Sequence, residues 1–228
     1  MLKQIINKLN SIQITKSHEN CSACGLPIPT CICEELNEFK QQVNSNVHID
    51  ILFHEKELSR NTNTGRLIGL LNPDKVSAHI WNRTTPPENL LSIINNDQNR
   101  CYLLFPPDES QSTEDLEEKS NQESNQIIGS ELSKTIHLIV IDGTWQEACK
   151  IVRKSSYLSE IQRLSVKSDK ASIFTLRRNQ KEGNLCTAEA IAEALKELED
   201  HSMADILEKF TALYLERYEI GRSGHGLK

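Results

Sequence analysis

Four of the seven cysteines in the chain lie close together, at Cys21, Cys24, Cys31 and Cys33. Thiolates are soft ligands, and four of them at this spacing can close a tetrahedral zinc site. All four ligands would come from the protein, so the metal would be structural. Two disulfides or four unligated thiols are the alternatives, and disulfides are unusual in a reducing cytosol. The spacing therefore predicts a small zinc-binding cysteine knuckle.

A second group able to do chemistry is Asp142-Gly143-Thr144-Trp145, which follows a β-branched run predicted to be a buried strand. Ligands collect outside the carboxyl ends of strands in parallel sheets, so Asp142 is placed to act as a base or as a ligand anchor. The motif also fits a helix start in which Thr144 caps the helix and Glu147 reaches back to it. For Asp142 a functional role and a capping role both stay open. Trp145 is expected in the core, with an exposed stacking platform as the alternative.

Polar residues also follow the first predicted strand and open the next helix. They suit an anionic group, because a helix N-terminus presents N–H groups to a phosphate or carboxylate. The residues concerned are His54, Glu57, Asn63, Thr64, Gly65 and Arg66. Arg177 ends another predicted strand and could bind an RNA phosphate. The alternative is that Arg177 simply lies on a solvent-exposed face of the protein. Thr187 stands where a helix N-cap is expected.

The elements that must position these residues follow an α/β pattern. Strands are predicted where β-branched and apolar residues alternate or run together, at 47–53, 76–81, 101–105, 136–141 and 172–176. Helices are predicted from apolar spacing and starting prolines, at 66–71, 86–94, from 145 onward, 187–198 and 204–218. The continuous run at 136–141 is typical of a strand buried on both faces of a parallel sheet. Cys101 and Cys149 lie on apolar stripes and are expected in the core.

Length and charge limit the possibilities further. The 228 residues suffice for one α/β domain with short appendages. Residues 108–134 hold 8 acids and 2 bases, which accounts for the whole net charge of −6, so the rest of the chain sums to zero. The acidic balance therefore does not exclude a nucleic-acid partner. This segment is rich in Ser, Gln, Asn and Glu and is interpreted as a mobile surface insertion.

Three parts are expected: residues 1–40 with the knuckle, a main domain at 41–220 and a tail at 221–228. No stretch approaches the roughly 18 apolar residues of a membrane helix, and the first ten residues lack a secretory apolar region, so a cytoplasmic location is expected. The chain contains no G-x-G-x-x-G, no G-x-x-x-x-G-K-[ST] and no G-x-S-x-G. A Rossmann dinucleotide site, a P-loop and a nucleophile elbow are therefore disfavoured.

Together these features resemble the DTW-domain family, whose known activity is tRNA-uridine aminocarboxypropyl transfer. The motif after which the family is named corresponds to the tetrapeptide from Asp142 to Trp145. The other landmarks, in order, are His54-x-x-Glu57, Asn63-Thr64-Gly65-Arg66-Leu67, Leu103-Leu104-Phe105-Pro106, Leu176-Arg177 and Thr187-x-Glu189-Ala190. The resemblance runs from the knuckle to about Leu198. Glu55 and Pro107 depart from it, at positions where the family often has proline and glycine.

The resemblance implies an α/β, SPOUT-like parallel sheet with a knotted C-terminal half. It implies S-adenosylmethionine as the donor substrate, bound at Phe105, Pro106, Ile141, Gly143, Leu185, Thr187 and Ala188. It further implies catalytic roles for Asp142, Thr144 and Trp145. The substrate-binding residues would be His54, Glu57, Asn63, Thr64, Gly65, Arg66 and Arg177. The implied partner is tRNA, no stable protein partner is evident, and a monomer or a homodimer is expected.

The implied reaction moves the 3-amino-3-carboxypropyl group onto the third ring nitrogen of a tRNA uridine and releases methylthioadenosine. That nitrogen must lose a proton, and Asp142 is the candidate base, although its carboxylate could instead bind the cationic donor. A SPOUT-type RNA methyltransferase would share the fold and the donor. A non-catalytic zinc-knuckle RNA-binding protein, or a purely structural interaction protein, would leave the Asp142 motif without a use.

Overall fold

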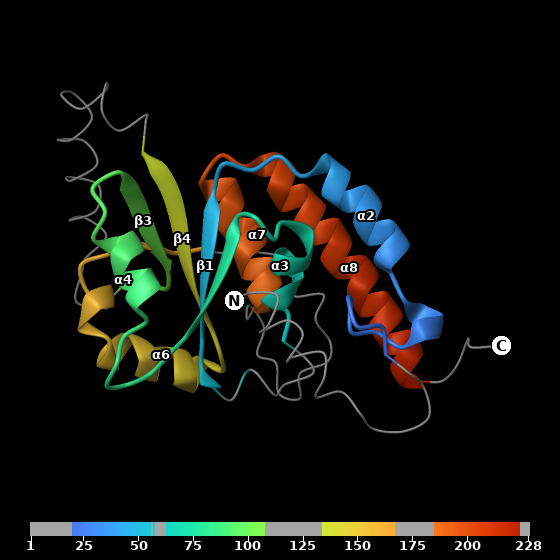
Figure 1. The fold of residues 1–228 in the computed structure, drawn as a ribbon, viewed down its shortest axis with the longest axis horizontal. Coiled ribbons are helices and arrows are strands. Elements are labelled where there is room, and N and C mark those ends of the chain that lie inside the picture. The colour runs from blue at the N-terminus through green and yellow to red at the C-terminus, as the bar shows by residue number, and fades with distance from the viewer. Residues whose placement is uncertain (1–19, 56, 58–62, 108–133, 167–184, 224–228) are drawn as a thin grey trace.

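The computed structural model describes residues 20–55, 57, 63–107, 134–166 and 185–223 (Figure 1). The described elements are η1 (Ile28–Thr30), α2 (Cys33–Gln42), β1 (His48–Phe53), α3 (Arg66–Leu71), β2 (Val76–Ile80), α4 (Glu88–Ile94), β3 (Asn99–Leu104), β4 (Thr135–Asp142), α6 (Trp145–Lys154), η4 (Ser156–Leu158), β5 (Gln162–Leu164), α7 (Thr187–Glu197) and α8 (His201–Ser223). The strand predicted at 172–176, Arg177 and nearly all of the acidic insertion lie outside these ranges.

The strands form one parallel sheet in the order β2-β1-β4-β3-β5. The parallel α/β architecture and four of these strands were predicted, and both are confirmed. In the register of the sheet, Phe53 pairs with Asp142 and Leu104 pairs with both Val140 and Leu164. The carboxyl ends of β1, β4, β3 and β5 therefore meet at one edge of the sheet, and the loops that follow them can build one site.

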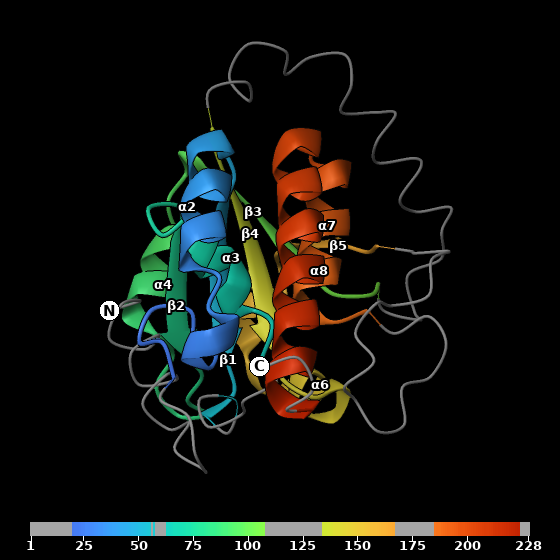
Figure 2. The same ribbon diagram turned by 90° about the vertical axis from the view of Figure 1, so that its right-hand side faces the viewer.

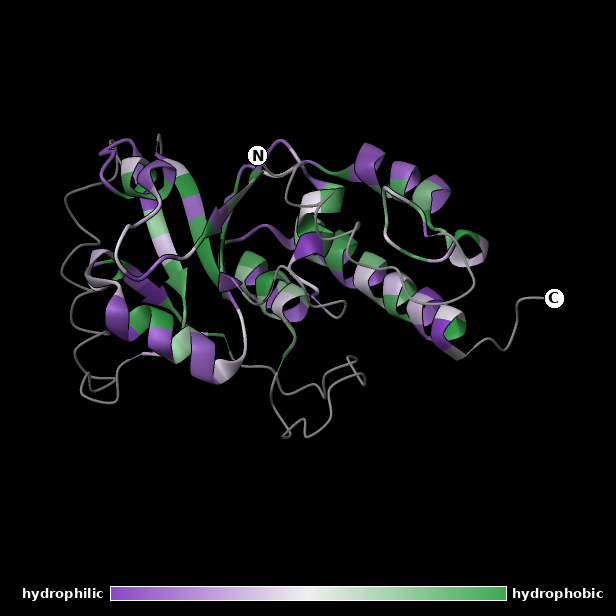
Figure 3. Ribbon diagram, turned by 60° about the horizontal axis from the view of Figure 1, so that its bottom comes forward, coloured by the Kyte–Doolittle hydropathy of each residue, from purple (hydrophilic) through white to green (hydrophobic). Residues whose placement is uncertain are grey.

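Helices cover both faces of the sheet, with α4 and α6 on one face and α2, α3, α7 and α8 on the other (Figure 1). Alternate residues of a strand point to opposite faces. In β1, Ile49, Ile51 and Phe53 join the core under α3, α7 and α8, while Leu52 joins the core under α4 and α6. The central strands are accordingly mostly hydrophobic along their length, whereas the outer helices mix both characters (Figure 3).

The C-terminal helices form a layer that also holds the N-terminal part of the described chain. Helix α8 packs along α7, and α2 lies beside α8 (Figure 2). Phe39 of α2 meets Phe210 of α8 edge to face at 5.5 Å, and Arg217 pairs with Glu35 at 3.0 Å. The described helices include none that is both long and apolar enough to cross a membrane.

The cysteine segment packs into the same core as the sheet. Cys24, Leu26 and Ile32 are fully buried and belong to the cluster beneath α8. Gly25 has φ of 78°, a conformation that suits glycine, and its N–H donates to the carbonyl of Cys21 at 2.8 Å to close the turn. The division of the chain at residue 40 stays a prediction.

Two local expectations were wrong. Trp145, expected in the core, is 61% exposed, because it is the first residue of α6 and lies at the edge of the sheet rather than under it. Thr187 is not the N-cap of α7. That position belongs to Cys186, whose N–H donates to Glu189 at 2.6 Å. Thr187 is the first residue of the helix, and its hydroxyl donates to Asp142 instead of capping the helix.

Cys101 and Cys149 are half-buried rather than fully in the core. Cys101 lies where β3 meets α4, and its thiol contacts the carbonyl of Ile93 at 3.9 Å. Burial raises the pKa of the Cys101 thiol to about 11, so this thiol stays protonated and unreactive near neutral pH. The helix after the DTW tetrapeptide buries Ala148 and Ile151 instead of Cys149.

Candidate functional site

A cavity of about 270 Å³ opens at the carboxyl ends of β3, β4 and β5 and is closed by the start of α7. Its walls are mostly apolar, with backbone and hydroxyl groups among them. The lining residues that the sequence did not single out include Val140, Ala148, Leu164, Ser165 and Val166. A concave, largely apolar cavity with a few polar groups is typical of a small-molecule site.

Six of the seven residues predicted to bind the donor lie around this cavity. They are Phe105, Pro106, Ile141, Gly143, Leu185 and Thr187. The seventh, Ala188, is fully buried behind the wall, where its N–H donates to the hydroxyl of Thr64 at 3.3 Å. The residues that the resemblance assigns to the donor therefore come from three loops that meet in space, although Phe105 and Leu185 are 80 positions apart in the sequence.

An aromatic stack forms one side of the cavity. The rings of Phe105 and Trp145 are nearly parallel, with centroids 5.3 Å apart and an interplanar angle of 9°. The guanidinium of Arg163 lies over the Phe105 ring at 5.5 Å, and its Nη1 donates to the carbonyl of Pro106 at 3.0 Å. A backbone contact and a cation–π contact thus fix Phe105, and Phe105 in turn supports the exposed indole.

Asp142 lies at the end of β4, directly behind the cavity. Its carboxylate is buried, and its Oδ1 accepts a hydrogen bond from the hydroxyl of Thr187 at 2.8 Å. Gly65 packs against the same carboxylate so closely that an added Cβ would collide with Oδ2. Asp142 therefore lies beside the cavity and reaches it through Thr187.

Thr144 and Glu147 form the predicted capping box at the start of α6. The N–H of Glu147 donates to the Thr144 hydroxyl at 3.3 Å, and the N–H of Thr144 donates to Glu147 at 2.8 Å. Nδ1 of His54 lies 3.8 Å from Glu147, and the His54 ring stacks on Trp81 at 5.7 Å. The direct role of Thr144 in this structure is to fix the strand-to-helix turn that follows Asp142.

The polar residues predicted to bind substrate are brought together, but not at the cavity wall. His54, Glu57, Asn63 and Thr64 are all buried. Nδ2 of Asn63 donates to Glu57 at 3.4 Å, and its Oδ1 accepts from the N–H that starts α3 at 3.2 Å. These side chains connect the ends of β1, α3 and α7 to one another. In this arrangement they support the site from behind.

Arg66 points away from the cavity, toward α8 and the cysteine segment. Its side chain is buried, donates to the hydroxyl of Tyr214 and lies over that ring at 5.2 Å. Burial lowers the pKa of Arg66 to about 10, while its proximity to Cys24 and Tyr218 acts in the opposite direction. This geometry does not present Arg66 to a substrate, and it instead places a buried cation between the sheet and the cysteine segment.

The four cysteines of the knuckle converge. Their Sγ atoms all lie within 4.8 Å of one another, with 3.4 Å between Cys21 and Cys33 and 3.8 Å between Cys24 and Cys31. Sulfur atoms held 2.3 Å from a tetrahedral zinc ion are about 3.8 Å apart. All four are free thiols, which excludes the two-disulfide alternative for this structure. Burial acts to raise the pKa of Cys21, but backbone N–H donors, led by that of Cys24, lower it to about 7.

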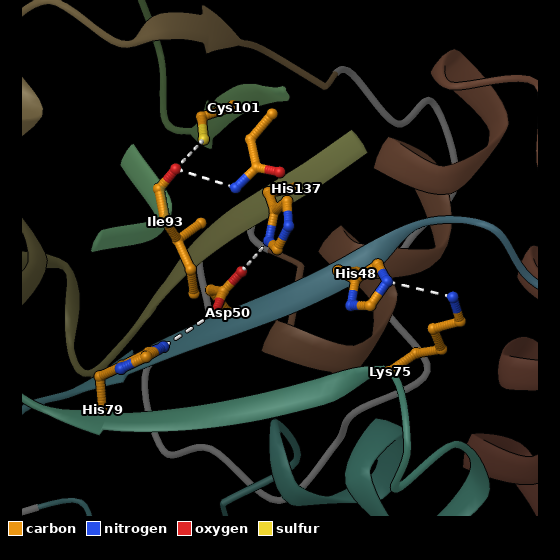
Figure 4. A network of polar contacts seen from close by, with 8 residues as sticks. His48, Asp50, Lys75, His79, Ile93, Cys101 and His137 are labelled. Carbon is orange, nitrogen blue, oxygen red and sulfur yellow. Dashed lines mark hydrogen bonds and ion pairs between the residues drawn. The ribbon is translucent and has the colours of Figure 1, made fainter. Parts of the chain in front are cut away.

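A separate polar network lies within the sheet (Figure 4). Asp50 of β1 accepts from Nε2 of His79 at 2.8 Å and from Nδ1 of His137 at 2.7 Å. His48 stacks on His137 at 4.9 Å, and its Nε2 lies 3.0 Å from Nζ of Lys75. Burial acts to raise the pKa of Asp50, but the hydrogen bonds from His137 and His79 hold it below its usual value. This network joins β2, β1 and β4 and contributes no lining residue to the cavity.

Comparison with known proteins decides the family. A sequence model described as the DTW domain matches residues 18–219, which is most of the chain. The chain belongs to the DTW-domain family. In this DTW domain the match begins before Cys21, so the knuckle lies within the family's own boundaries.

Curated relatives of this DTW domain carry the name tRNA-uridine aminocarboxypropyltransferase 2. The protein from Drosophila melanogaster is 27% identical over 183 residues, which cover 78% of this chain and 66% of the relative. The protein from Mus musculus is 25% identical over 193 residues, covering 84% and 60%. The chain thus spans about two thirds or less of the length of these relatives. No solved structure matches the chain significantly.

Several residues of this DTW-domain site escaped prediction. Leu164, Ser165 and Val166 follow β5, a three-residue strand with too few residues for an alternating pattern. Arg163 precedes them and belongs to none of the motifs found in the sequence. A signal existed for Ala190, because the helix-start motif includes it. The folded structure was needed to show which face of α7 closes the cavity.

Proposed function

We propose that this chain is a tRNA-uridine aminocarboxypropyltransferase. It transfers the 3-amino-3-carboxypropyl group of S-adenosylmethionine to the third ring nitrogen of a tRNA uridine. The observation that carries the proposal is the cavity, in which three loops far apart in sequence meet beside the DTW tetrapeptide. The names of the relatives support the same activity.

The residues around the cavity fit such a donor. Apolar side chains such as Leu104, Val140 and Leu164 can bury an adenosine, and the neighbouring loops offer backbone groups. A buried carboxylate lies behind Thr187, and a fixed negative charge in a poorly solvated place attracts a cationic ligand strongly. Phe105, Pro106, Ile141, Gly143, Leu185 and Thr187 would contact the donor.

The proposed chemistry balances as a simple displacement. The uridine nitrogen loses its proton to solvent water and forms a bond to the γ-carbon of the aminocarboxypropyl group. The bond between that carbon and sulfur breaks, its electron pair stays on sulfur, and neutral methylthioadenosine leaves. The sulfonium makes three attached carbons electrophilic, so the protein's main task is to orient one of them toward the acceptor.

For Asp142 we propose the role of donor anchor rather than general base. A base must come within hydrogen-bond reach of the proton it takes. The Asp142 carboxylate is 2% exposed and already accepts from Thr187, whereas Thr187 itself lines the cavity. Asp142→Asn is therefore expected to weaken donor binding more than tenfold. Unchanged donor affinity with an altered pH–rate profile would instead assign the base role.

The cysteine knuckle is proposed to hold a structural zinc ion. Four converging thiols, one buried and three half-buried, suit this metal, and the ion would connect the cysteine segment to the end of α8. The SPOUT-like knot stays a prediction, since residues 167–184 lie outside the described chain. The cytoplasmic location and the choice between monomer and homodimer also stay predictions.

The experiment that tests the function is incubation of the purified chain with unmodified tRNA and S-adenosylmethionine, followed by mass spectrometry of nucleosides and by-products. Methylthioadenosine together with an aminocarboxypropylated uridine is the expected result. S-adenosylhomocysteine with a methylated base would replace the proposal by methyl transfer. tRNA binding without any by-product would favour a non-catalytic RNA-binding role.

A further inference from the structure

Trp145 is the most exposed of the large hydrophobic side chains that stand out on the described surface. It is 61% exposed, against 55% for Ile28 and 44% for Ile80. Ile28 lies in the cysteine segment and Ile80 lies on the edge strand, whereas Trp145 lies at the cavity. A large exposed aromatic ring at the rim of a ligand cavity needs an explanation beyond packing.

The two faces of the indole have different surroundings. One face is covered by the nearly parallel ring of Phe105. Phe105 also meets the guanidinium of Arg163, which lies over its ring and donates to the carbonyl of Pro106. Arg163 and Phe105 thus support an indole that stays largely exposed.

We propose that the outer face of Trp145 is the surface on which the target uracil of the RNA stacks. This inference rests on the proposed function and adds where the acceptor base lies. Every nucleobase has a π-face, and stacking on exposed aromatic rings is the common way in which proteins hold an unpaired base. A base that must react at a ring nitrogen has to leave its own stack, and Trp145 offers a replacement.

The position of the Trp145 indole also favours contact with the acceptor uracil rather than with the donor, S-adenosylmethionine. Trp145 contributes to the cavity wall, and one face of its ring is covered by Phe105, so the exposure of the indole lies mainly on its other face. A uracil on the outer face lies at the cavity mouth, with its ring edge toward whatever the cavity holds. The support by Phe105 and Arg163 orders the platform before the base arrives.

The test compares Trp145→Phe and Trp145→Leu with the wild-type chain, and uses Ile80→Ala as an exposed apolar control. Removing a stacking ring weakens binding of one base by about 5- to 150-fold. We expect a rise of that size in the KM for tRNA with Trp145→Leu, a smaller rise with Trp145→Phe and none with Ile80→Ala. The Kd for S-adenosylmethionine, measured without RNA, is expected to stay within twofold in all three.

A direct readout uses tRNA transcripts with 5-iodouridine in place of uridine, irradiated on the full chain. A cross-link that maps to Trp145, and disappears in Trp145→Leu, is the expected result. A loss of donor affinity without a change in the KM for tRNA would overturn the inference and assign the ring to the donor. An unchanged donor affinity together with an unchanged KM for tRNA in Trp145→Leu would overturn the inference as well. Failure of the proposed function would appear earlier, as a wild-type chain that forms no product.

Discussion

Thr187 connects the cavity to the buried carboxylate of Asp142 through one hydroxyl. Its Oγ1 donates to Oδ1 of Asp142, and the same residue lines the cavity wall. Thr187→Val keeps the shape but removes the donor, which leaves a buried carboxylate oxygen without that bond at a cost of about 1–3 kcal/mol. We expect a lower free energy of unfolding in urea and weaker donor binding by calorimetry.

Thr187→Ser is the matched control, because it retains the hydroxyl. It should restore most of the donor affinity, and equal affinity in the serine and valine variants would contradict the role of this hydrogen bond. The sequence predicted the residues at this point but not their connection. Thr187 was expected to cap α7, and the structure shows that Cys186 occupies that position while Thr187 serves Asp142.

At the scale of elements, the central strands contain a buried charge that should make stability depend on pH. The hydrogen bonds of His79 and His137 hold the pKa of Asp50 below its value of 3.8 in an unfolded chain. The ionised carboxylate therefore stabilises the fold fully above about pH 4, and this contribution is lost as the pH falls through the lower folded-state pKa.

Asp50→Asn removes the charge and leaves both imidazoles in place. Breaking a buried pair of this kind costs about 3 kcal/mol, so the melting temperature should fall at pH 7. In melting curves from pH 3 to 7, the difference in melting temperature between the two proteins should begin to narrow as the pH falls below about 4. A constant difference over the whole range would show that Asp50 contributes through packing rather than charge.

Elements with strong local patterns could be predicted from the sequence, and elements defined by packing could not. The continuous β-branched run was sufficient to predict β4, and the two prolines before α4 were sufficient to predict its start. The strand β5 has three residues and exists because it pairs with β3. Trp145 follows the apolar period of α6 yet lies at the edge of the sheet, which only the tertiary structure reveals.

At the scale of the whole molecule, the knuckle joins the start of the described chain to its last helix. Thr30 and Pro27 lie against Gly221 of α8, where an added Cβ would be only 3.0 Å from Pro27. Removal of the proposed zinc ion with a chelator should therefore lower the melting temperature of the entire fold, because the cysteine segment shares its core. The purified chain should carry one zinc ion by mass spectrometry.

Cys31→Ser should lose the zinc, whereas Cys149→Ser, a half-buried cysteine on α6, should keep it. Full zinc content in Cys31→Ser would contradict the four-thiolate site. The spacing of the cysteines was enough to predict this cluster. It was not enough to predict that Arg66, expected at the substrate, is buried between the sheet and the knuckle beside Tyr214.

The proposed function requires that the cavity at the ends of β3, β4 and β5 holds S-adenosylmethionine. Ala190 of α7 lines this cavity, and Glu197 on the same helix is exposed to solvent. Calorimetric titration of the donor into the wild-type chain, Ala190→Phe and Glu197→Phe tests it directly. We expect at least a tenfold loss of donor affinity in Ala190→Phe alone, at unchanged melting temperature. Equal affinity in all three proteins would show that the donor binds elsewhere.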